Sequence, residues 1–100
     1  MSPLETRLAA LGAAGQTITY GDLARELGLR MAALTAALES LMEDDAASGS
    51  PFRAAVLCQR LSPDHLPAPG FFLKAAELGR PTDDPVAFTA RERLRLSSPE

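Results

Sequence analysis

The stretch "TITYGDLARELGL", residues 17–29, combines a short extended segment, a capped helix and a helix stop. The β-branched residues at its start favour a strand of two or three residues. Thr19 is a good N-cap for the following helix, and Asp22 stands three residues on, in the reciprocal position of a capping box. Gly28 supplies the left-handed residue that ends a helix. This order is typical of the first half of a helix-turn-helix.

Two further helices flank this unit. Ser2, Pro3 and Glu5 form a compact helix start, in which the serine caps, the proline suits the first turn and the glutamate completes a capping box. Gly15 is the predicted end of that first helix. A third helix is predicted from about Met31 to Asp44, because apolar residues recur there on one face. These apolar positions are Leu34, Leu38, Leu41 and Met42.

The second half of the chain mixes strand and helix patterns. A loop at 44–51 precedes alternating apolar and polar residues that predict a strand over 51–61. Three prolines exclude regular structure from 62–70. The segment 71–79 fits either a returning strand or a short helix. An aspartate cap followed by a proline predicts a final helix over 84–96.

Three helices followed by a β-hairpin form a winged-helix arrangement, with the proline-rich loop as the wing. The predicted fold class is α+β, with one winged-helix-like domain over 1–96, an added C-terminal helix and a disordered tail at 97–100. The 100 residues suffice for one modest core. One cysteine excludes an internal disulfide and fits a cytoplasmic protein, and no apolar run is long enough for a membrane span.

"TITYGDLARELG" resembles the opening of the winged-helix DNA-binding region of the alkylguanine DNA alkyltransferases and alkyltransferase-like proteins. The matching positions run from Thr19 to Ala24. That family continues to a P-C-H-R motif whose cysteine accepts an alkyl group, whereas this chain reads Leu57-Cys58-Gln59-Arg60. The resemblance therefore implies alkyl-lesion recognition or transfer at Cys58, but the proline and the thiol-activating histidine are missing.

A second resemblance covers more of the chain. "ITYGDLA", an apolar strand after a Ser/Gly-Pro turn, "PAPGFF" and "LGR" are similar to a group of small bacterial winged-helix-like proteins of unassigned function. This resemblance implies the fold and leaves the activity open.

The sequence contains no recognisable catalytic or metal-binding constellation. Cys58 alternates with apolar residues, which favours core packing over a reactive thiol. His65 is the only histidine, so a transition-metal site lacks ligands. The acidic run 43–45 lacks the spacing of a calcium loop. Phosphate-binding glycine motifs are absent. We therefore expect a protein that is not an enzyme and needs no cofactor or metal.

Charge places any polyanion contact in the second half of the chain. The net charge is −3, with three arginines against seven acids in residues 1–50 and seven basic residues against six acids in 51–100. The outward face of the third helix carries Glu39 and Glu43 and no base-reading side chain, which argues against major-groove insertion. The basic residues that we expect to contact phosphate are Arg30, Arg53, Arg60, Lys74 and Arg80.

Consecutive large apolar residues after the proline-rich loop suggest a second possibility. If the domain cannot bury them all, the remainder forms a partner or homodimer surface. The residues of this predicted surface are Phe71, Phe72, Phe88 and Leu94. The sequence thus leaves two main hypotheses: a DNA-associated or regulatory protein with non-specific phosphate contacts, and a protein-interaction module that binds no nucleic acid.

Overall fold

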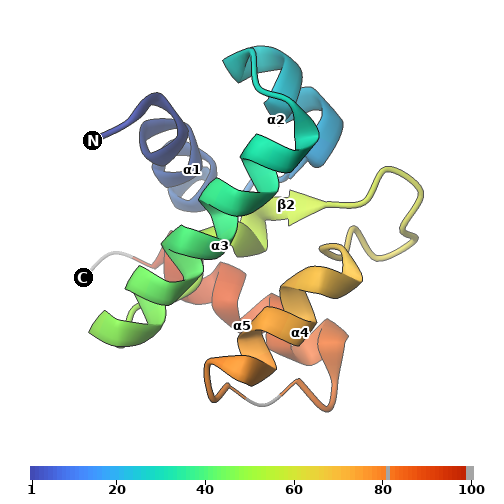
Figure 1. Ribbon diagram of the computed structural model, residues 1–100. Coiled ribbons are helices and arrows are strands. Elements are labelled where there is room, and N and C mark those ends of the chain that lie inside the picture. The colour runs from blue at the N-terminus through green and yellow to red at the C-terminus, as the bar shows by residue number, and fades with distance from the viewer. Residues whose placement is uncertain (81, 99–100) are drawn as a thin grey trace.

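A computed structural model describes residues 1–80 and 82–98. It shows a mainly helical molecule with one small sheet of two very short strands. The strand that is labelled in Figure 1 lies among the helices. In chain order the elements are α1 (Pro3–Ala14), β1 (Ile18–Thr19), α2 (Tyr20–Leu27), α3 (Met31–Ser48), the 3₁₀ turn η1 (Arg53–Val56), β2 (Leu57–Cys58), α4 (Pro69–Glu77) and α5 (Pro85–Ser97).

The predicted boundaries of α1 and α2 are confirmed, because local capping chemistry fixes them. Ser2 and Glu5 form both hydrogen bonds of a capping box at the start of α1. The Thr19 hydroxyl accepts the Asp22 backbone N–H at 3.2 Å, which caps α2. Gly28 ends α2 with φ +67°, a conformation that suits glycine.

The hairpin wing is not found in the described residues. β1 and β2 pair in parallel, with Ile18 opposite Leu57 and Thr19 opposite Cys58. The predicted strand over 51–61 is mostly wrong, since residues 53–56 form η1 and only 57–58 are extended. The alternation of apolar and polar residues does not indicate a strand here. η1 packs against α1, α3 and α5 together, so both of its faces are buried.

Two other segments are more helical than predicted. α3 continues to Ser48, so the loop expected at 44–51 is wrong over its first half. Asp45 explains the extension: it lies buried on the inner face of α3, where Arg53 pairs with it. The ambiguous segment 71–79 lies mainly within α4, which begins at Pro69. The predicted disordered tail, 97–100, is wrong at Ser97, which is the last residue of α5. Residues 99 and 100 of that tail lie outside the described residues.

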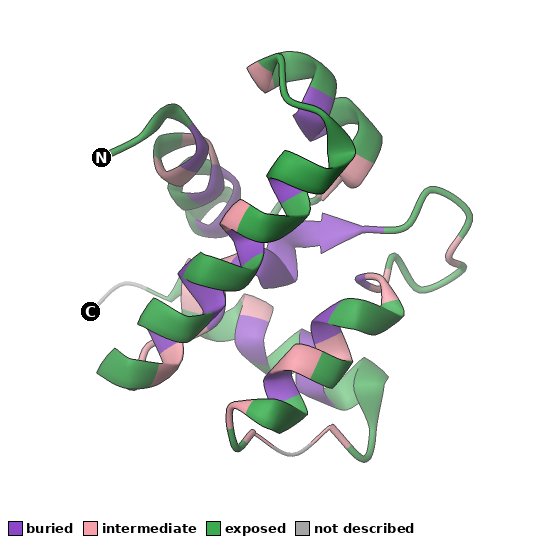
Figure 2. Ribbon diagram, viewed as in Figure 1, coloured by how far each residue is buried: buried purple, intermediate pink, exposed green. Residues whose placement is uncertain are grey.

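The core is centred on Phe52, which is fully buried. Its ring lies 5.9 Å from the Phe71 ring and 6.4 Å from the Phe88 ring, centroid to centroid. Buried residues line the inward faces of the helices and most of η1 and β2, whereas the loop after β2 is largely exposed (Figure 2). Within the described residues, no helix is long and apolar enough to cross a membrane.

Candidate functional site

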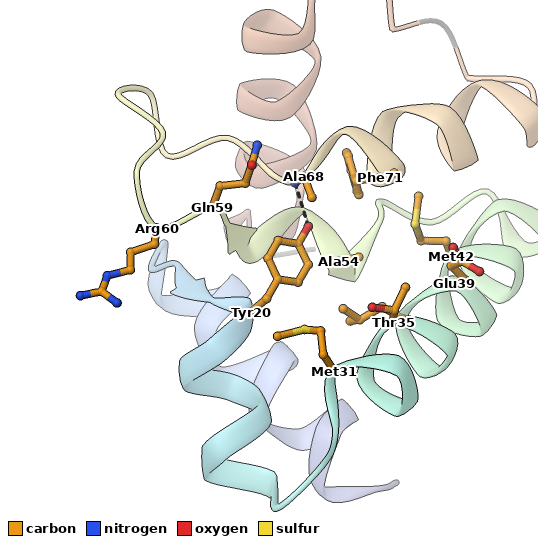
Figure 3. Close-up of a pocket in the computed structure, with 12 residues that line it drawn as sticks. Tyr20, Met31, Thr35, Glu39, Met42, Ala54, Gln59, Arg60, Ala68 and Phe71 are labelled. Atoms are coloured by element: carbon orange, nitrogen blue, oxygen red, sulfur yellow. Dashed lines mark hydrogen bonds between the residues drawn. The ribbon is translucent and has the colours of Figure 1, made fainter.

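A cavity of about 410 Å³ lies between α3, the start of α2 and the start of α4. Its walls are mainly apolar, with a few polar side chains at the edges (Figure 3). Five parts of the chain contribute. The lining residues are Tyr20, Met31, Thr35, Leu38, Glu39, Met42, Ala54, Gln59, Arg60, Ala68, Gly70 and Phe71.

Tyr20 lines the cavity and hydrogen-bonds to Ala68, another lining residue. It follows the Thr19 cap directly, so the first turn of α2 carries its ring inward toward Ala68 (Figure 3). The Ala68 backbone N–H donates a hydrogen bond of 3.0 Å to the Tyr20 hydroxyl. Burial raises the pKa of Tyr20, with a further increase from nearby Cys58 and a partial offset from the Ala68 hydrogen bond and Arg93. The phenol is therefore neutral at physiological pH.

Tyr20 was not among the residues that we predicted for the site, although it is the only tyrosine. The sequence does draw attention to Tyr20, because this residue belongs to the stretch 17–29. The same motif places it next to a helix cap, which fixes its position closely. Its cavity partner Ala68 lies 48 residues further along the chain, and this pairing has no local sequence signature.

Two of the predicted phosphate-contact residues remain exposed near the cavity. Arg60 forms part of its rim and extends away from the interior (Figure 3). It also lines a second, more polar cleft beside the start of α2, together with Asp22 and Arg25. Arg30 is the exposed residue before Met31, at the start of α3. Neither Arg30 nor Arg60 forms an ion pair with another residue in the described part of the chain.

The other three predicted contact residues are held in ion pairs. Arg53 pairs with Asp45 at 2.9 Å and with Glu5 at 3.2 Å. Lys74 pairs with Glu43 of α3 at 2.7 Å. Arg80 pairs with Glu92 and lies over the Phe52 ring. Acidic side chains thus pair with these three cations, whereas Arg30 and Arg60 have no such partner among the described residues.

The predicted partner surface is likewise divided by the structure. Phe71 and Phe88 are buried around Phe52, and Phe72 is half-buried against them. Leu94 alone among the four is well exposed, at 67%. The aromatic residues thus complete the domain's own core.

Cys58 is buried and does not line the cavity. Behind it lies Arg93 of α5, which donates hydrogen bonds to the backbone carbonyls of Ala55 at 2.7 Å and His65 at 2.6 Å. Burial lowers the pKa of Arg93, and the nearby Cys58 and Tyr20 partly restore it. The His65 side chain is exposed on the loop.

No group of three or more potential metal ligands occurs in residues 1–80 and 82–98. The chain matches no model of a known protein family, no curated protein and no solved structure.

Proposed function

We propose that this protein associates with nucleic acid and holds one unstacked base in the cavity beside Tyr20. The observation that carries the proposal is the position of an apolar cavity, partly walled by aromatic rings, next to two exposed arginines without ion-pair partners among the described residues. Proteins that bind unstacked bases combine these two features, because the base packs on apolar or aromatic groups and the phosphates need cations.

The cavity suits a planar heterocycle in size and chemistry. Its 410 Å³ falls within the range of small-molecule sites. Tyr20 and Phe71 supply aromatic surface, and Met31 and Met42 supply polarizable apolar surface. Hydroxyl and amide groups of Thr35 and Gln59 lie at the edges, where a base carries its donors and acceptors.

The direction of approach follows from charge. The exposed face of α3 carries Glu39, which repels phosphate, and Glu43, which is paired with Lys74, and neither reads a base edge, so we place no major groove against this helix. Two of the predicted contact residues have no ion-pair partner among the described residues: Arg60, which lines the cavity, and Arg30, which directly precedes the lining residue Met31. We therefore place the phosphates of the bound strand near Arg60 and Arg30.

The proposed activity is recognition without group transfer. The resemblance to alkyltransferase-like proteins runs through Tyr20, which lines the cavity. Cys58, by contrast, is buried and outside the lining, so a ligand in the cavity does not reach its thiol. Incubation with a duplex that contains an alkylated guanine should leave the mass of the protein unchanged. A covalent adduct on Cys58 would contradict this part of the proposal.

The proposal can be tested by filling the cavity. Gly70 lines the cavity, and a Cβ built on it meets no heavy atom within 4 Å, so Gly70→Leu adds apolar bulk at the cavity wall. Ala76→Leu is the matched control, because it adds the same side chain to an exposed position of the same helix. We expect Gly70→Leu to weaken binding of a fluorescently labelled single-stranded oligonucleotide by about tenfold, a loss of about 1.4 kcal/mol. Ala76→Leu should bind as the wild type does.

The proposed phosphate contacts of the arginines can be tested by measuring binding affinity at several salt concentrations. Wild-type affinity should fall as salt rises, and Arg60→Gln should reduce the slope of that dependence by about one phosphate contact. Arg91→Gln is the control, because it removes the same charge from an exposed position outside the cavity lining. Binding that is absent, or that does not respond to salt, overturns the proposal.

As a second candidate we propose a protein-interaction module, and the exposed Leu94 on α5 favours it. A large apolar side chain in this position can pair α5 with the same helix of another copy. Analytical ultracentrifugation should then show a dimer that Leu94→Glu converts to a monomer. A wild-type monomer at high protein concentration would contradict this candidate.

A further inference from the structure

Two polar side chains of α3 lie next to each other in the wall of the cavity. Thr35 and Glu39 are four residues apart, so they share one face of the helix and stand one turn from each other. Both line the cavity, and both are exposed. A hydroxyl, which donates and accepts hydrogen bonds, therefore adjoins a carboxylate, which only accepts them. This pair presents a donor beside an acceptor to a bound ligand.

The carboxylate of Glu39 has no ion-pair partner in residues 1–80 and 82–98. Glu43, one turn further along α3, pairs with Lys74 at 2.7 Å. The hydrogen bond to Glu43 raises the pKa of Lys74, and the charges of Glu77 and Glu39 add to this rise. Lys74 is thus one cation among three carboxylates. The Glu39 end of the cavity therefore stays negative and favours a ligand group that donates hydrogen bonds.

The two ends of the cavity differ in charge. Arg60 and Glu39 lie at opposite sides of the group of lining residues, with Tyr20 and Thr35 between them (Figure 3). Phosphate is attracted by Arg60 and repelled by Glu39, so a bound nucleotide directs its base toward Glu39. The edge of the base that lies farthest from the sugar then faces α3. In an unstacked base this edge is free to form hydrogen bonds with protein side chains.

We propose that Thr35 and Glu39 select the base, and that the cavity prefers cytosine or adenine to thymine or guanine. This inference rests on the proposed function and adds the class of base that is bound. Cytosine and adenine each carry an amino group, which donates, beside a ring nitrogen, which accepts. Glu39 accepts from the amino group, and Thr35 donates to the ring nitrogen. Thymine and guanine carry a carbonyl oxygen in place of the amino group, so the carboxylate would face another acceptor.

The test uses short labelled oligonucleotides that keep one base and are abasic at every other position, so that only this base can occupy the cavity. The single base is cytosine, adenine, thymine or guanine, and a fifth strand is abasic throughout. All five strands carry the same phosphates, so differences in wild-type affinity report the contribution of the base. We expect the cytosine and adenine strands to bind about tenfold more tightly than the thymine and guanine strands.

Two variants test the selecting residues, and the ratio of affinities for the cytosine and thymine strands is the readout. Glu39→Gln keeps the length of the side chain but adds an N–H donor, so this ratio should fall close to one. Thr35→Val keeps the shape but removes the hydroxyl, so the ratio should also fall. Asp44→Asn is the matched control, because it removes the same charge from an exposed position of α3 outside the cavity lining. It should change the affinity of every strand by the same factor and leave the ratio unchanged.

Several results would overturn the inference. They are equal wild-type affinity for the four single-base strands, tightest binding of the thymine or guanine strand, and a cytosine preference that survives Glu39→Gln. Gly70→Leu separates this failure from that of the proposed function. If the four single-base strands bind equally, all bind more tightly than the abasic strand, and Gly70→Leu removes that gain, only the base selection fails. If no base improves on the abasic strand, the proposed function fails as well.

Discussion

Arg80 and Glu92 form an ion pair of 2.8 Å, and both residues contact Phe52, the central aromatic residue of the core. The Arg80 guanidinium carbon lies 3.9 Å from the centroid of the Phe52 ring. The same Glu92 oxygen accepts the Phe52 backbone N–H at 2.9 Å. Glu92 therefore fixes both the main chain and, through Arg80, the ring of Phe52. Because Ala54 of the cavity wall follows two residues later, this pair also supports the proposed site.

Neutralising Glu92 should destabilise the protein strongly. Its side chain is 4% exposed and that of Arg80 is 18% exposed, so the loss leaves a poorly solvated cation. We expect Glu92→Gln, which keeps an oxygen acceptor for Phe52, to lower the free energy of unfolding by about 1.5–3 kcal/mol. Glu92→Leu, which removes every acceptor, should cost about 3–5 kcal/mol in urea unfolding.

The control for Glu92 is the exposed pair between Arg7 and Glu26. Both side chains of that pair are well solvated, so Glu26→Gln should cost only about 0–1 kcal/mol. Equal losses for Glu26→Gln and Glu92→Gln would contradict the assignment of Glu92 to a buried structural role.

Tyr20 should make stability depend on alkaline pH. Burial raises the pKa of its phenol above the ordinary value in the folded state. A group with a raised folded pKa contributes stability that is present below its unfolded pKa of about 10 and lost as pH rises through the folded value. The free energy of unfolding should therefore fall more steeply above about pH 10 in the wild type than in Tyr20→Phe.

The direct readout is the absorbance of tyrosinate, because Tyr20 is the only tyrosine. Its midpoint should lie higher in the folded protein than in urea. Near neutral pH, Tyr20→Phe should cost about 1 kcal/mol, because the Ala68 N–H loses its acceptor. Coincident midpoints in the folded and unfolded protein would show that the phenol is solvated.

The sequence predicts those parts of the fold that depend on neighbours in the chain. Helix starts at Ser2 and Thr19 follow from side chains that bond to backbone groups three residues away. The predicted hairpin wing is wrong because its strand pattern depends on distant parts of the chain. Ala54 and Ala55 are buried at adjacent positions because three helices pack around them. No pattern along residues 51–61 carries that information.

Only single residues of the candidate site, and not the cavity itself, could be predicted from the sequence. Arg30 and Arg60 were expected to be available, and both are exposed. Whether a cation is free, however, depends on which acid the fold brings to it. The Arg53 guanidinium meets Glu5, 48 residues away, and Arg80 meets Glu92 across the core. The cavity likewise combines side chains from distant segments, so no local motif indicates it.

Arg93 should control the order of the loop between β2 and α4, residues 59–68. It donates to the His65 carbonyl on this loop and to the Ala55 carbonyl next to the cavity wall. It also donates to the Leu57 carbonyl at 3.3 Å. The shorter side chain of Arg93→Gln cannot make all three bonds, so we expect a loss of about 1.5–3 kcal/mol in the free energy of unfolding. Amide hydrogen exchange at Gln59 and Leu66 should also accelerate, because their hydrogen bonds depend on the closed loop.

Arg91→Gln is the control for this experiment, because Arg91 is exposed on the same helix. It should change neither stability nor exchange appreciably. Unchanged exchange at Gln59 and Leu66 in Arg93→Gln would show that the loop is held without the arginine.

Glu5 should make the N-terminal helix sensitive to acid. Hydrogen bonds from the Ser2 backbone and hydroxyl, supplemented by Arg53, lower the pKa of its carboxyl group below the ordinary value. A group with a depressed folded pKa contributes stability that is present above its unfolded pKa of about 4.3 and lost as pH falls through the folded value. The stability difference between the wild type and Glu5→Gln should therefore be largest near neutral pH and shrink toward about pH 3. Ser2→Ala should weaken this pH dependence, because it removes the hydroxyl contribution to the cap. A difference that is constant between neutral and acidic pH would mean that the Glu5 charge has no part in holding α1.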